Sequence, residues 1–260
     1  GGLKLLPDEI NARKHVPGAV SAVAIPGPDG NPLPGSSGSQ FFVCDGYMNT
    51  LDGKYSVFGW VTEGMDTVRA ISIMPKTGDR LNDRVEIRKV TVRPVTPSVE
   101  ELGRLRARIA TESGEIVWEF LPTAPENARN FVRLARAGYY DGATIYRAVP
   151  NMLLQGASSE GWPAESPNKK RSFSIWPLPD EFTASVPFDR GVVGMAHGAD
   201  PNSATVHWFV LTGRASHLDA KYTPFARVVS GKEVVDAISK MPAPGERLAT
   251  PVRITKVTIE

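Results

Sequence analysis

The chain reads LDGKY at residues 51–55 and LDAKY at residues 218–222, and the two stretches belong to a long internal repeat. A shift of 167 positions lays residues 51–92 over residues 218–259, and 21 of the 42 paired residues are identical. A period of this length is the size of a whole domain rather than of a stacked solenoid unit. The sequence therefore predicts a tandem duplication of one domain.

The two copies differ in completeness. Residues 104–172, which make 69 positions, have no counterpart in the first copy. We therefore predict the C-terminal half of a first domain at residues 1–93, a linker at 94–103 and a complete domain at 104–260. Because half a closed sheet would leave unpaired strand edges and an exposed core face, we expect that the front of the first copy was removed; the alternative is a genuine half domain.

Composition excludes several classes of protein. The 260 residues carry 30 basic and 28 acidic side chains, a formal charge of +2, which is too even a balance to predict a nucleic-acid partner. The single cysteine, Cys44, excludes an intrachain disulfide and a zinc site built from paired cysteines. No apolar run approaches the roughly 20 residues that a membrane helix needs, so no membrane partner is predicted.

Residues 104–260 have the pattern of a strand-rich domain with two helices. Strands at 105–110 and 115–120 form a hairpin. A helix follows with Thr123 as its N-cap and Gly138 at its end, and its apolar face consists of Ala128, Phe131, Val132, Leu134 and Ala135. Further strands are predicted at 143–149, 152–157, 191–197, 206–212, 224–229 and 252–259, and a second helix at 231–240. Short strands at this density predict a mainly β fold closed into a barrel.

Two groups of motifs resemble a known family. Residues 138–142 read GYYDG and residues 146–156 read YRAVPNMLLQG, while the first copy carries GSQFF at 38–42 before LDGKY at 51–55. In this order they resemble the cyclophilin family of peptidyl-prolyl cis-trans isomerases. The resemblance implies an eight-stranded antiparallel closed barrel capped by two helices, in tandem. It also implies an isomerase that assists protein folding, uses no cofactor and acts on proline-containing polypeptides.

Rotation about an X-Pro bond requires neither a nucleophile nor a proton acceptor, because its barrier of about 20 kcal/mol comes from amide resonance. A catalyst must hold the proline in an apolar pocket and donate a hydrogen bond to the prolyl nitrogen. Arg147 fits the donor role, and Gln155 could anchor the substrate carbonyl. By similarity to the family, the substrate-binding residues are Met152, Leu153, Ala196, His197, His207, Phe209, Leu218 and Tyr222, with Ala196 and His197 supplying backbone contacts.

Each assignment has a simpler alternative. A lone arginine in a strand is usually an outward-facing charge, and apolar strand residues are usually core. His197, His207 and His217 are spaced ten apart, which could suggest a metal site. That spacing matches no zinc-ligand rule, so no metal is predicted.

The sequence also departs from the family at the groove. His207 replaces a glutamine, Tyr146 a histidine, and His217 the tryptophan of cyclosporin-sensitive members, so weak cyclosporin binding is predicted. In the first copy Gln40, Phe42, Leu51 and Tyr55 match the family groove, but the arginine-bearing strand is absent. Two hypotheses therefore remain: an isomerase, or a catalytically weak module that binds proline-containing segments as a chaperone or scaffold.

Overall fold

The computed structural model describes residues 5–92, 97–162, 164, 166–170, 173 and 175–260. The described residues form two compact units. Unit 1 contains the described residues up to 92 together with 175–177, and unit 2 contains the rest from residue 97 onward. None of the helices in the described part of the chain has both the length and the apolar character that crossing a bilayer demands.

Unit 2 is built around a barrel. Among the described residues, eight antiparallel strands close in the order β10-β11-β9-β8-β13-β6-β7-β12. The strands are β6 (Arg106–Thr111), β7 (Gly114–Phe120), β8 (Thr144–Val149), β9 (Leu153–Ser158), β10 (Val192–Met195), β11 (Trp208–Leu211), β12 (Thr223–Ser230) and β13 (Arg247–Ile259). The predicted closed barrel of eight antiparallel strands is confirmed, and β13 is longer than predicted because it begins at Arg247.

Aromatic side chains fill the barrel interior. Trp118 on β7 and Trp208 on β11 are at most 1 % exposed and meet edge to face, with ring centroids 4.9 Å apart. Gly156 on β9 makes room for the Trp208 ring, because a Cβ at this glycine would lie 2.5 Å from the ring. Phe131 and Phe225 are fully buried beside them. This packing gives the strands a rigid support on which a site can be built.

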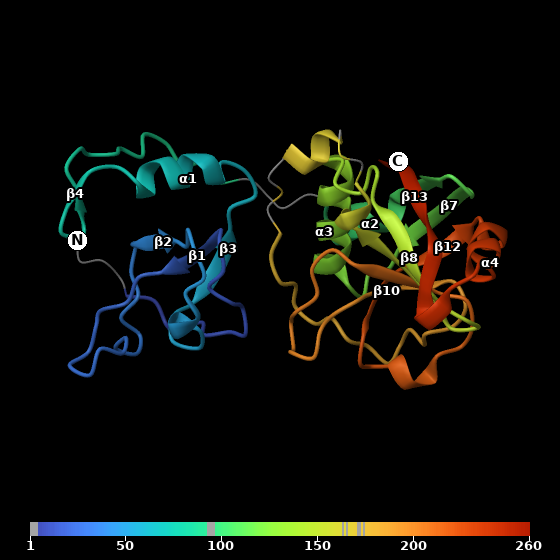
Figure 1. Ribbon diagram of the computed structural model, residues 1–260. Coiled ribbons are helices and arrows are strands. Elements are labelled where there is room, and N and C mark those ends of the chain that lie inside the picture. The colour runs from blue at the N-terminus through green and yellow to red at the C-terminus, as the bar shows by residue number, and fades with distance from the viewer. Residues whose placement is uncertain (1–4, 93–96, 163, 165, 171–172, 174) are drawn as a thin grey trace. The chain divides into compact units, whose positions relative to one another are not determined.

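Two helices cover opposite sides of the barrel (Figure 1). Helix α3 (Pro125–Arg136) packs on β12 and β13, and α4 (Lys232–Ser239) packs on β7, β8 and β9. The predicted apolar face of α3 is buried as expected. Gly138, at φ 77°, ends the helix, because the N–H groups of Gly138 and Tyr139 turn back to bond Ala135 and Leu134.

The predicted N-cap of α3 is wrong. The capping position is Ala124, which offers no side-chain acceptor. Instead the carboxylate of Glu181 accepts hydrogen bonds from the N–H groups of Glu126 and Asn127, at 3.0 and 2.9 Å. A carboxylate satisfies these N–H groups better than a threonine hydroxyl does, because its charge also complements the helix dipole.

The predicted linker is also wrong over its second half. Residues 99–104 form helix α2 (Val99–Arg104) in unit 2, with Ser98 and Glu101 in a reciprocal capping box. Leu102 is fully buried, and α2 packs on β7 and α3. Residues 94–96 of the predicted linker lie outside the described residues.

Unit 1 is a small sheet with one helix. Strands β1 (Ala19–Ala22), β2 (Phe41–Val43) and β3 (Val57–Trp60) form a sheet in the order β2-β1-β3, followed by α1 (Met65–Ser72) and the short pair β4 (Lys76–Thr77) and β5 (Arg80–Leu81). Its core consists of Ala19, Cys44 and Val57 with Phe42 and Trp60 packed against them.

The pairing of strands in unit 1 repeats that of β10, β11 and β12. Val20 pairs with Val43 as Val193 pairs with Val210, which is the same register at the offsets of the sequence repeat. The β1–β3 pair has a bulge after Val20, and β10–β12 has one after Val193. Both helices that follow begin after a left-handed glycine, Gly64 in α1 and Gly231 in α4.

Candidate functional site

A groove on unit 2 gathers nine of the ten residues that the sequence singles out there. Its cavity of about 320 Å³ is lined by Arg147, Met152, Leu153, Gln155, Ala196, His197, Phe209, His217, Leu218 and Tyr222. His217, predicted as a rim residue, is the one further member. The groove lies across strands β8, β9 and β11 and the two loops that follow β10 and β11.

Strand register places the polar and apolar parts of the groove side by side. Phe209 on β11 pairs with Gln155 on β9, and Gln155 pairs with Arg147 on β8. Residues directly opposite each other on neighbouring strands point to the same face of a sheet. The register therefore places an aromatic ring, an amide and a guanidinium in one row.

Two acceptors hold the guanidinium of Arg147. Its Nη1 donates to Gln155 Oε1 at 3.0 Å, and its Nε and Nη2 donate to Glu246 Oε2 at 3.1 and 2.5 Å. The arginine side chain is 35 % exposed. The guanidinium is therefore held by two neighbouring side chains, while part of it remains open to solvent. The sequence analysis missed Glu246, although an acid stands at the same place in both copies, as Asp79 and Glu246.

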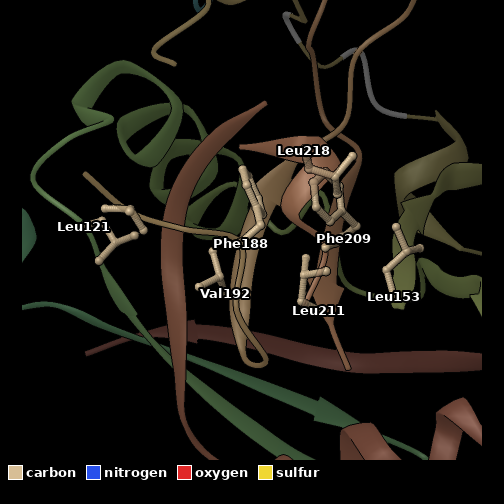
Figure 2. Close-up of a cluster of buried hydrophobic side chains, with 9 residues drawn as sticks. Leu121, Leu153, Phe188, Val192, Phe209, Leu211 and Leu218 are labelled. Carbon is tan, nitrogen blue, oxygen red and sulfur yellow. The ribbon is translucent and has the colours of Figure 1, made fainter. Parts of the chain in front are cut away.

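The apolar floor of the groove continues a buried cluster (Figure 2). Leu153, Phe209 and Leu218 are between 3 and 8 % exposed and belong to this cluster, while Met152, Ala196 and Tyr222 pack against it. Phe209 stacks on Phe188 with centroids 5.6 Å apart. Both rings fit because β10 has Gly194 there; a Cβ at this position would lie within 2.7 Å of either ring.

The loop that carries His217 and Leu218 is fixed by Asp219. Asp219 Oδ1 accepts the N–H of Phe188 at 2.8 Å and a guanidinium N–H of Arg214 at 2.9 Å. The hydrogen bond from Arg214, and then that from the Phe188 N–H, hold the pKa of this carboxyl below its usual range. The short helix η4 (Ser216–Leu218) is thereby held against the floor of the groove.

His197 packs against Tyr222, and both side chains line the groove. Its Nε2 lies 3.0 Å from the carbonyl oxygen of Lys221, and its ring lies 4.3 Å from that of Tyr222. The N–H of Ala196 donates to the carbonyl of His207 at 2.9 Å. Ala196 and His197 are the residues predicted to contact substrate through their backbone. The N–H of Ala196 is already bonded within the barrel.

His207 is the predicted groove residue that does not line the cavity. It lies just before β11, and its Nδ1 is 3.5 Å from the hydroxyl of Tyr146. Burial lowers the pKa of His207 and raises that of Tyr146. Two of the residues that depart from the family pattern thus contact each other, and neither lines the cavity.

The four predicted groove residues of the first copy are not brought together. The rings of Phe42 and Tyr55 meet edge to face at 5.9 Å, and both contact the buried His15. Gln40 instead lines a separate cavity of about 280 Å³, which Phe42, Leu51 and Tyr55 do not line.

Across the described residues, His, Cys, Asp and Glu side chains form no group of three or more that could hold a metal ion. The polar side chains that line the groove are those of Arg147, Gln155, His197, His217 and Tyr222, beside an apolar floor. The fold and the groove together define the class: a closed antiparallel β-barrel with a cavity lined by side chains of β8, β9 and β11 and of the loops beside them.

Comparison with known proteins assigns the family. The family model of cyclophilin type peptidyl-prolyl cis-trans isomerases matches residues 1–92 and 106–259. The peptidyl-prolyl cis-trans isomerase CYP18-1 of Arabidopsis thaliana is 33 % identical over 154 residues, which cover 57 % of this chain and 92 % of that protein. A probable peptidyl-prolyl cis-trans isomerase of Brucella abortus (strain 2308) is 33 % identical over 157 residues, covering 57 % and 79 %.

A solved structure agrees in fold. The cyclophilin type isomerase of Cryptosporidium parvum, crystallised in the presence of the dipeptide Ala-Pro, superposes with a TM-score of 0.53 at 22 % identity, over 60 % of this chain and 98 % of that one. The chain belongs to the cyclophilin type peptidyl-prolyl cis-trans isomerase family, and its function is peptidyl-prolyl isomerisation.

Proposed function

We propose that the groove of unit 2 is the site at which this chain isomerises X-Pro bonds, with Arg147 as the donor to the prolyl nitrogen. As the amide twists, its resonance is lost and a lone pair localises on that nitrogen. A guanidinium N–H aimed at the lone pair stabilises the twisted state more than the planar one, which lowers the barrier. The observation that carries the proposal is the row of Phe209, Gln155 and Arg147 across three strands.

The substrate of this site is a proline-containing polypeptide. The cavity of about 320 Å³ has Met152, Leu153, Phe209 and Leu218 at its apolar part, which suits a proline ring. The guanidinium has five N–H groups, of which Glu246 and Gln155 engage three within the described part of the chain, so two remain for substrate. The Ala-Pro dipeptide used with the Cryptosporidium parvum relative is consistent with this substrate class.

The test compares wild type with Arg147→Ala in a protease-coupled assay of a short X-Pro peptide. We expect kcat/KM to fall by about 10² to 10³, which is the usual cost of removing a donor aimed at the transition state. The matched control is Arg247→Ala, since Arg247 pairs with Arg147 across β13 and β8 but does not line the groove. Equal rates in wild type and Arg147→Ala would instead favour the module that only binds proline-containing segments.

The repeat supports a proposal for unit 1 as well. Residues 1–93 correspond to the C-terminal half of a cyclophilin-like domain, and the complete domain is at 104–260, in tandem. The matching registers and bulges of the two units support this reading. A further match is Asp52, whose Oδ1 accepts the N–H of His15 at 2.8 Å, as Asp219 accepts that of Phe188.

No strand among the described residues of unit 1 corresponds to β8, so these residues offer no counterpart of Arg147 as a donor. Activity of this chain should therefore depend on unit 2 alone. Phe209→Ala should lower kcat/KM, whereas the corresponding Phe42→Ala should leave it unchanged. A loss of activity in Phe42→Ala with unit 2 still folded would contradict the assignment of a single active groove.

A further inference from the structure

Glu246 accepts hydrogen bonds from Arg147, the proposed donor. It ends the short helix η5 (Pro244–Glu246) and immediately precedes β13. Its Oε2 accepts both the Nε and the Nη2 hydrogens of Arg147, at 3.1 and 2.5 Å. The contact joins residues 99 positions apart, and both side chains are partly exposed, at 35 % for Arg147 and 48 % for Glu246.

The carboxylate approaches a different edge of the guanidinium from the one that faces Gln155. Gln155 accepts the hydrogen bond from Nη1, and Glu246 accepts those from Nε and Nη2. Arg147 and Gln155 both line the cavity, whereas Glu246 does not. The carboxylate therefore holds the guanidinium without occupying the place of the substrate.

The backbone at Glu246 is costly. Gly245 and Glu246 have φ of 60° and 66°, a left-handed region in which a residue with a Cβ is strained. The turn nevertheless presents a carboxylate here, and the first copy has Asp79 at the corresponding place. An acid at this turn thus recurs in both copies.

We propose that Glu246 is a positioning residue for isomerisation, which fixes the rotamer of Arg147 so that its remaining N–H groups point at the prolyl nitrogen. This inference rests on the proposed role of Arg147. A charge-assisted pair to Nε and Nη2 limits rotation of a long side chain that would otherwise sample many rotamers. Because orientation matters more for the twisted amide than for binding, removal of Glu246 should affect kcat rather than KM.

The experiment measures kcat and KM of the full chain for an X-Pro peptide in four proteins: wild type, Glu246→Ala, Glu246→Gln and Glu160→Gln. We expect kcat to fall about tenfold in Glu246→Ala with KM within twofold. Glu246→Gln, which keeps an acceptor of the same length without the charge, should be intermediate. Glu160→Gln is the matched control, because Glu160 pairs with the neighbouring Arg247 at 3.2 Å and should leave the rate unchanged.

A second measurement separates positioning from a general structural effect. In an Arg147→Ala background, Glu246→Ala should cause no further loss, and in wild type the Nε–H signal of Arg147 should shift on Glu246→Ala with thermal stability unchanged. A further loss in the double variant, an unchanged kcat in Glu246→Ala, or an increased kcat there would each overturn the inference. If Arg147→Ala itself has no effect, the proposed function fails; if it does and Glu246→Ala does not, only the inference fails.

Discussion

Gln155 and Arg147 are register partners on β9 and β8, and the amide oxygen of Gln155 accepts the Nη1–H of Arg147 at 3.0 Å. Because the oxygen of the amide faces the guanidinium, its NH2 group is left for another acceptor. On the proposed assignment, a substrate carbonyl in the groove is the acceptor for this NH2 group. The guanidinium would then face the prolyl nitrogen, and the amide would anchor the peptide.

This division predicts the effect of two substitutions at Gln155. Gln155→Glu keeps an acceptor for Arg147 but has no NH2 donor, and Gln155→Ala has neither. Both should lower kcat/KM about tenfold, the usual value of one hydrogen bond to a well-placed partner. The check is the same peptide assay. A wild-type rate in Gln155→Glu would mean that Gln155 serves only to hold Arg147.

Cyclosporin binding should be weak and limited by the groove rim. His217 is exposed on η4 next to the buried Leu218, in the place where cyclosporin-sensitive members have tryptophan. A tryptophan there offers a larger apolar surface and an N–H donor. His217→Trp should therefore tighten cyclosporin binding about tenfold, as measured by calorimetry, without changing kcat/KM. Inhibition of wild type at low cyclosporin concentration would contradict the prediction.

Local patterns predicted the eight barrel strands and helices α3 and α4 of unit 2, whereas they missed contacts between residues that are distant in the sequence. The apolar spacing around Phe131 predicts α3, but its cap comes from Glu181, 55 positions away from Glu126. Arg147 and Gln155 stand out by family motif, whereas Glu246 lies 99 positions from Arg147 and belongs to no motif. The helix at 99–104 was missed because a proline-rich stretch precedes its Ser98 cap.

The stability of unit 2 should fall on the acid side because of His207. Burial lowers the pKa of this imidazole, so the unfolded chain takes up the proton first as pH falls below about 6.5. The folded state therefore loses stability between about pH 7.5 and 5. His207→Gln, which installs the residue that the first copy has as Gln40, should flatten this part of the profile. The check is the Tm of wild type and of His207→Gln, each measured at about pH 7.5 and at about pH 5. An equal fall in Tm in the two proteins would contradict the assignment to His207.

A left-handed alanine in the groove loop predicts a stabilising substitution. Ala220 has φ of 53°, and the corresponding residue of the first copy is Gly53 at φ 70°. A Cβ in this conformation costs about 1 to 2 kcal/mol, which exceeds the entropy that glycine adds to the unfolded chain. Ala220→Gly should therefore raise the free energy of unfolding by about 0.5 to 1 kcal/mol, or the Tm of unit 2 by a few degrees.

The control is Ala237→Gly on the exposed side of α4, where the same substitution should cost about 1 kcal/mol because the residue is helical. Denaturant titration of both variants measures the two changes, and the same sign in both would show that backbone conformation does not decide the effect.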